Sequence, residues 1–199
     1  MSHTTVCGFP REGEGFVIGE VHNAFRGAMA VWDIIAKEHF GLERFPMAPR
    51  STKMEQRIWN TWQDRTLPLY QRVVLASTLD TTLVRYDHIP TLIEHMFDFD
   101  ANFSGQTNLA EQALLIEEST LDENLFAVGW NQTSVCSNPW EIAGYDEDKY
   151  HMVDLSVDLE NNTINAGWLC IPPDDDRINI VEAKYMIDPR WDTKGEFIE

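Results

Sequence analysis

Apolar residues recur every three to four positions in five segments of the first 120 residues, a spacing typical of helices with one buried face. The pattern predicts helices over 23–40, 52–62, 67–78, 88–97 and 109–118. Asn23 is expected to begin the first helix and Gly41 to end it.

Two of these helices start with the pattern of a capping box. Thr52 with Glu55, and Asn108 with Glu111, place a small polar residue three positions before a glutamate. The stretch FDFDANFSGQTN, residues 97–108, is then expected to connect the fourth and fifth helices.

The pattern changes to strands beyond residue 125. β-branched and aromatic residues predict strands over 125–135, 151–159, 163–171 and 177–187, and shorter strands earlier, over 15–21 and 81–87. The sequence ENN at 160–162 is typical of a hairpin turn. Alternation within 152–159 places Leu155 and Val157 on one face of that hairpin and Asp154 and Asp158 on the other.

These elements predict an α+β fold, with N-terminal helices packed on a mainly antiparallel C-terminal sheet. A single domain over 1–199 is expected, helix-rich and nearly neutral over 1–120, and strand-rich and acidic over 121–199. The strand at 15–21 needs a partner, which favours one domain over two.

Charge is divided unevenly along the chain, whose net charge is −18. Residues 1–86 hold ten Lys and Arg against nine Asp and Glu, whereas residues 87–199 hold five against twenty-four. The 63 residues between Arg85 and Lys149 contain thirteen carboxylates and no Lys or Arg. With 43% hydrophobic residues the chain can still bury a core, so disorder does not explain this composition.

No apolar run approaches the roughly 18 residues of a membrane span, and the first residues lack the zones of a signal peptide. A cytoplasmic protein without membrane association is therefore expected. The three cysteines are widely spaced and form no CxxC, which predicts neither a disulfide framework nor a structural zinc site.

Two groups of residues have a spacing that metal ions use. Asp98, Asp100 and Asn102 match the first three ligand positions of an EF-hand loop, but Phe103 and Leu109 replace the Gly and Glu that such a loop needs. An exposed turn is the favoured interpretation.

The second group consists of His88, Glu94, His95 and Asp98, whose imidazoles and carboxylates could converge on zinc, manganese or iron. A metal-assisted hydrolase or transferase using His88, His95 and nearby carboxylates is therefore the alternative enzyme hypothesis. No P-loop or GxSxG motif is present, and no cofactor is expected.

The charge distribution favours a binding protein over an enzyme. The hypothesis is an acidic intracellular inhibitor that presents carboxylates to a protein partner with a basic, nucleic-acid-handling surface. DNA-mimicking anti-restriction and anti-CRISPR proteins of bacterial viruses act in this way, and the comparison rests on charge and size alone. Direct binding to nucleic acid is opposed by the charge.

The residues expected to contact the partner are the acids of the second part of the chain: Asp98, Asp100, Glu117, Glu118, Asp122, Glu123, Asp146, Glu147, Asp148, Asp154 and Asp158. A third hypothesis is an immunity, structural or assembly protein with an acidic interaction face. It predicts a partner whose contact surface is not a nucleic-acid groove.

Overall fold

The computed structural model of the chain describes residues 3–11, 15–22, 27–46, 52–79, 82–131 and 150–171. Within them the helices are α1 (Ala28–Phe40), α2 (Thr52–Asn60), α3 (Leu69–Ser77), α4 (Ile89–Asn102) and α5 (Leu109–Ser119), with short 3-10 turns at Thr61–Gln63 and Tyr86–His88. The strands are β1 (His3–Pro10), β2 (Phe16–His22), β3 (Thr82–Arg85), β4 (Leu125–Asn131), β5 (Tyr150–Asp158) and β6 (Thr163–Ile171).

The six strands form one mixed sheet in the order β2-β1-β4-β3-β5-β6. β3 and β5 pair in parallel, and the other neighbouring strands pair antiparallel. The fold prediction was therefore wrong in its arrangement. Strands begin the chain, the helices are interspersed among them, and the sheet is built from both halves of the sequence instead of from the C-terminal half alone.

The strand β1 was missing from the sequence prediction although it occupies an interior position of the sheet. It pairs with β2, as the neighbouring strand along the chain, and with β4, more than 110 residues later. Gly8 and Pro10 weaken its β propensity. The strand is stabilised by these distant partners, which a local pattern does not register.

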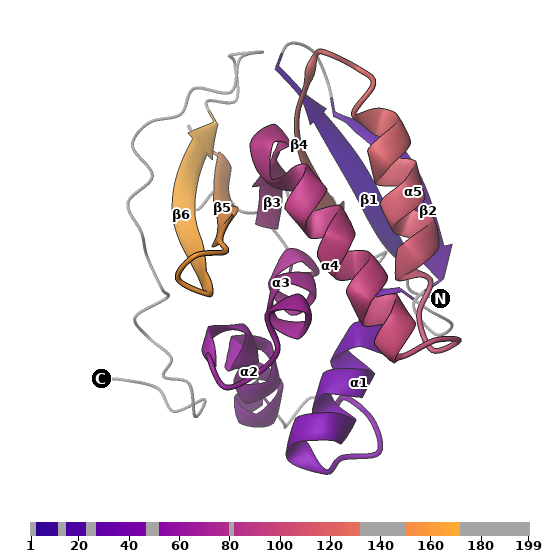
Figure 1. The fold of residues 1–199 in the computed structure, drawn as a ribbon, viewed down its shortest axis with the longest axis vertical. Coiled ribbons are helices and arrows are strands. Elements are labelled where there is room, and N and C mark those ends of the chain that lie inside the picture. Colours follow the sequence, from indigo (N-terminus) through magenta and orange to yellow (C-terminus); the bar gives the residue numbers. More distant parts are fainter. Residues whose placement is uncertain are drawn as a thin grey trace.

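Helices α5, α4 and α3 cover one face of the sheet (Figure 1). α4 packs against both α5 and α3, while α5 contacts β2 and α3 contacts β3, β5 and β6. The order of these helices thus follows the order of the strands from one sheet edge to the other. α1 packs on α2 and α3 below this layer in the view of Figure 1.

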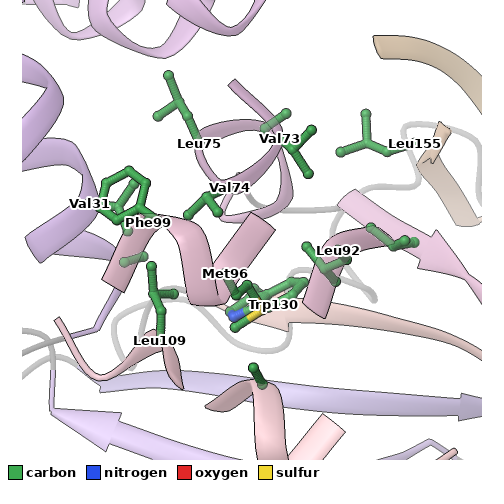
Figure 2. Packing of buried hydrophobic residues seen from close by; sticks show 14 of the residues in the cluster. Val31, Val73, Val74, Leu75, Leu92, Met96, Phe99, Leu109, Trp130 and Leu155 are labelled. Atoms are coloured by element: carbon green, nitrogen blue, oxygen red, sulfur yellow. The ribbon is translucent and has the colours of Figure 1, made fainter. Parts of the chain in front are cut away.

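The core lies between the helices and this face of the sheet (Figure 2). Alternate positions of adjacent strands supply its sheet side, because Val6 pairs with Trp130, and Val84 pairs with Val128 and Leu155. From the helices, buried residues such as Val31, Val74, Leu92, Met96 and Phe99 fill the other side. This layer of apolar side chains is the main stabilising contact between the two halves of the chain.

The predicted helices occur where they were expected, but their first and last residues differ from the prediction. Gly41 ends α1 in a left-handed conformation (φ 65°), as glycine readily does. The observed N-cap of α1 is Gly27, so the helix begins later than predicted. Asn108 is the N-cap of α5, but its side chain makes no capping bond, because its Oδ1 accepts a hydrogen bond of 2.6 Å from Gln112 Nε2. The side chain of Thr52 lies outside the described residues.

The predicted hairpin is confirmed, since β5 and β6 pair antiparallel from Tyr150–Ile171 to Asp158–Thr163. Leu155 is buried and Val157 packs against the core, as the alternation predicts, but Leu159, which the same alternation places on that face, is 57% exposed because it lies in the turn beyond β5. In the turn, Asn162 adopts a positive φ of 52°, which asparagine tolerates better than most residues. The predicted strand at 177–187 lies outside the described residues. Among the described helices, none has the length and apolar character needed to cross a bilayer.

Candidate partner-binding surface

Eight of the exposed carboxylates of the described chain lie on α4, α5 and the turns beside them, while Glu20, Glu38, Glu43 and Glu160 are exposed on other elements. We call this set of eight the α4–α5 acidic surface, and each member is exposed: Asp87, Glu94, Asp98, Glu111, Glu117, Glu118, Asp122 and Glu123. Because α4 and α5 pack side by side, acids of two chain segments lie on neighbouring elements (Figure 1). Four of the predicted contact residues, Glu117, Glu118, Asp122 and Glu123, come together at the C-terminal end of α5.

This surface has no compensating cations of its own. The sequence has no Lys or Arg between Arg85 and Lys149. In the part of the chain that the structure describes, no Lys or Arg forms an ion pair with a member of the surface; the nearest such contact is His95 Nδ1 to Asp98 Oδ2, at 3.8 Å. Within the described residues these carboxylates therefore have no Lys or Arg partner.

Glu117 and Glu118 occupy positions that oppose helix stability. Both lie in the last turn of α5, which contains no basic residue. The C-terminal end of a helix carries partial negative charge, so a glutamate there is unfavourable by a few tenths of a kcal/mol, while a lysine would be favourable. Glu111 lies in the first turn, where the same effect favours it.

The stretch at 97–108 is helical over its first half, so the predicted connection between the two helices is confined to 103–108 and the prediction was wrong for 97–102. α4 continues to Asn102, because Phe99 is fully buried in the core and holds this turn of the helix against it. Asp98 and Asp100 are two positions apart on this helix and so point to different sides. Asp100 accepts a hydrogen bond of 2.6 Å from Thr107 Oγ1, and Asn102 Nδ2 donates to the carbonyl oxygen of Asp98. These three residues do not form an EF-hand loop.

The histidines of the enzyme hypothesis differ in their surroundings. His88 is half-buried on the 3-10 turn, and His95 is buried on α4 at 8% exposure, with no hydrogen-bond partner for either ring nitrogen among the described residues. Burial lowers the pKa of His95, and the nearby carboxylates Glu94 and Asp98 partly oppose that shift. Within the described residues no three His, Cys, Asp or Glu side chains come together as metal ligands.

The hairpin acids lie elsewhere in the fold. Asp158 is on β5, which is separated from β2 by three strands, or about 19 Å between the two strands, while α5 packs at the β2 edge. Its carboxylate accepts hydrogen bonds from the backbone N–H and the side chain of Asn161, and these bonds lower its pKa. Asp158 thus lies far from the acids at the end of α5, and the predicted contact residues do not form one continuous patch among the described residues.

The side chains of the remaining predicted contact residues lie outside the described part of the chain. Asp154 pairs with Leu83 in the parallel register, and its side chain lies outside the described residues, as do Asp146, Glu147 and Asp148 entirely. Conversely, Asp87, Glu94 and Glu111 belong to the surface but were absent from the predicted set. All three lie in the stretch without Lys or Arg that follows Arg85, so the sequence could have indicated them.

Comparisons with protein families, with curated proteins and with solved structures yield no match for this chain. Function is therefore argued from the site itself.

Proposed function

We propose that this protein is an acidic binding protein that inhibits a nucleic-acid-handling partner by covering its basic surface with carboxylates. The observation that carries the proposal is the α4–α5 acidic surface, where eight exposed carboxylates occur and no Lys or Arg of the described ranges pairs with them. A basic partner would supply the missing counter-charges, and their attraction would speed association.

The density of acids at the C-terminal end of α5 supports a comparison with a nucleic-acid strand. Glu117 and Glu118 in the last turn of the helix, with Asp122 and Glu123 in the turn that follows, place four carboxylates within seven residues. One strand of duplex DNA likewise presents a dense row of phosphates, one every ~3.4 Å of axis. Lysines and arginines that bind phosphates could therefore meet these carboxylates.

The placement of Glu117 and Glu118 supports binding over simple solubility. A solubilising acid serves equally well at many exposed positions, whereas these two lie where the helix dipole opposes them. Uncompensated acids on adjacent helices also repel each other and lower the stability of the fold. Residues that reduce stability are common at binding sites, where function maintains them.

The other hypotheses differ from this one in what they predict. A metal-assisted enzyme has little support in the described residues, because His88, His95 and the nearby carboxylates form no group of three potential ligands. An immunity, structural or assembly protein would also use an acidic face. Its partner, however, would not be displaced by DNA.

Capture of partners from a lysate of the source cells, at low salt, tests the proposal. Bound proteins are then challenged with duplex DNA or, as a polyanion control, with polyglutamate at equal charge. We expect DNA to release the bound proteins at a lower concentration than polyglutamate, and the purified partner to lose nucleic-acid binding when this protein is added. Equal release by both polyanions, or no release by DNA, would contradict the proposal and favour the assembly hypothesis.

A matched pair of charge variants locates the interaction. Glu117→Gln/Glu118→Gln/Glu123→Gln removes three charges from the surface, and Glu38→Gln/Glu43→Gln/Glu160→Gln removes three exposed charges from other elements. The first variant should bind at least about tenfold more weakly, mainly through slower association, and the second should bind nearly as the wild type. Equal effects of the two variants would mean that total charge, and not this surface, determines binding.

A further inference from the structure

Three leucines are exposed on and beside α5, between its acids. Leu114 is 56% exposed, Leu115 38% and Leu121 81%. Single exposed apolar residues are common on protein surfaces and need no explanation, but several on one short helix mark a possible contact site. The arrangement of these leucines relative to the acids determines what kind of partner they fit.

Helical geometry puts two of the leucines and two of the acids on the same side of α5. The buried side consists of Leu109, Gln112, Ala113 and Ile116. Residues three, four and seven positions apart share a side. The opposite side of the helix therefore carries Glu111, Leu114, Leu115 and Glu118, and the exposed Leu121 and Asp122 follow in the turn beyond Thr120. We call these six residues the α5 outer face, which contains both acidic and apolar side chains.

The apolar character continues onto the edge of the sheet. Leu115 lies over Gly19 of β2, so closely that a Cβ at Gly19 would be 3.1 Å from Leu115 Cδ1. β2 is an edge strand whose Phe16 and Val17 are exposed, and because successive strand residues point to opposite faces of the sheet, only one of these two can lie on the α5 side. In Figure 1 no described helix or strand lies on the outer side of α5. The outer face and this strand together form a mixed acidic and apolar surface.

A second copy of the chain does not fit this face. In a two-fold dimer both subunits use the same surface patch, so the acids Glu111, Glu118 and Asp122 of one copy would face the same acidic patch of the other, and no Lys or Arg of the described residues pairs with them. Such like-charge contacts are unfavourable. The charge on the face instead requires a positive partner, and the leucines require that this partner also be apolar.

We infer that the α5 outer face docks a basic amphipathic helix of the partner protein. Leucines of α5 would pack against the apolar side of that helix, and lysines or arginines flanking this side would pair with Glu111, Glu118 and Asp122. This inference rests on the proposed function and specifies the partner's contact element. A nucleic-acid-like contact with a flat basic surface would use the acids and leave Leu114 and Leu121 in water.

Binding of designed peptides, followed by fluorescence anisotropy, tests the inference on the full chain. One labelled peptide of about 18 residues, roughly five helical turns, has leucines on one side and lysines on the other. A second has the same composition with the leucines distributed around the helix, and a third is oligolysine. We expect the first peptide to bind at least about tenfold more tightly than the other two. Equal binding of all three, or no binding of the first, would overturn the inference.

Two leucines with nearly equal exposure provide the matched control. Leu114 is 56% exposed on the outer face, and Leu159 is 57% exposed in the β5–β6 turn. Leu114→Ser and Leu121→Ser, singly and together, should weaken the first peptide's binding, by about tenfold in the double variant. Leu159→Ser should change it less than about twofold. Similar losses in both sets would refute docking at this face. Because the three residues are exposed, the variants are expected to fold, and chemical denaturation checks that they do.

The two proposals fail in different ways. If partners captured from lysate are still released by DNA but bind the Leu114→Ser/Leu121→Ser variant normally, docking at this face is wrong and the proposed function stands. If the amphipathic peptide binds as expected but captured proteins resist DNA, the docking face stands and the nucleic-acid-handling partner is wrong.

Discussion

Arg72 on α3 and Asn162 in the β5–β6 turn lie ninety positions apart, and Arg72 Nη1 donates a hydrogen bond of 3.0 Å to the carbonyl oxygen of Asn162. Arg72 Nε donates a second bond, of 2.8 Å, to the carbonyl oxygen of Trp62. The side chain is only 2% exposed. One buried guanidinium thus connects the helical layer to the β5–β6 hairpin, which lies at the sheet edge opposite β2.

Replacement of Arg72 should destabilise this connection. Arg72→Met leaves two carbonyl oxygens without their donor, and we expect a loss of roughly 2–4 kcal/mol in the free energy of unfolding. Arg72→Lys should be intermediate, because a single amine cannot reproduce the fixed fork of the guanidinium. Urea denaturation measures both. The control Arg65→Met, at an exposed position, should change stability by less than about 0.5 kcal/mol, and a similar loss in both variants would contradict this role.

His95 should make stability depend on pH in the mildly acidic range. Burial lowers its pKa in the folded protein, so the unfolded chain takes up the proton first as the pH falls. The stability due to neutral His95 is complete above the unfolded value of about 6.5 and declines as the pH falls from there towards the lower folded pKa. The slope due to this one group cannot exceed about 1.4 kcal/mol per pH unit.

His95→Leu tests that dependence. The variant removes a buried polar ring without hydrogen-bond partners among the described residues, so at pH 7.5 we expect it to be within about 1 kcal/mol of the wild type. At pH 5.5 it should be the more stable of the two. Denaturation curves at both pH values provide the measurement. A difference between variant and wild type that stays constant with pH would exclude His95 as the source.

Gln112 should stabilise the contact between α5 and β4. Its Oε1 accepts a hydrogen bond of 3.2 Å from Trp130 Nε1, and both side chains are buried. Gln112→Leu leaves the indole N–H without an acceptor, which we expect to lower the free energy of unfolding by about 1–3 kcal/mol. A double-mutant cycle with Trp130→Phe, which removes the donor, should show positive coupling between the two positions. Strictly additive losses would mean that the bond contributes little.

Replacement of Glu118 by lysine should raise the stability of the protein and weaken its binding. Glu118→Lys places a positive charge in the last turn of α5, where the helix dipole favours it. We expect stability to rise by about 0.3–1 kcal/mol, while binding of the amphipathic basic peptide weakens. Thermal unfolding and anisotropy measure the two effects on the same preparation. A variant that is less stable than the wild type would show that Glu118 makes a stabilising contact.

Local physical rules account for the elements that the sequence predicted well. Apolar spacing located the five helices, the alternation in 152–159 identified which side of β5 faces the core, and Gly41 marked a helix end. The stretch without Lys or Arg after Arg85 indicated, from the sequence alone, which segment carries the acidic surface. Each of these features depends on residues that are neighbours along the chain.

The sheet and the α5 outer face depend on contacts between residues far apart in the sequence. Only the tertiary structure determines those contacts. β1 has weak local propensity and becomes an interior strand through β4, and α4 extends through Asp98 and Asp100 because Phe99 finds a buried site. Leu114 is an ordinary apolar position of the predicted helix, and only the structure shows that it is exposed, because Leu109, Gln112, Ala113 and Ile116 occupy the buried side. Sequence by itself thus determined where charge and apolar residues occur. Packing determined which of them remain in water, because the burial of a side chain depends on which other elements pack against it.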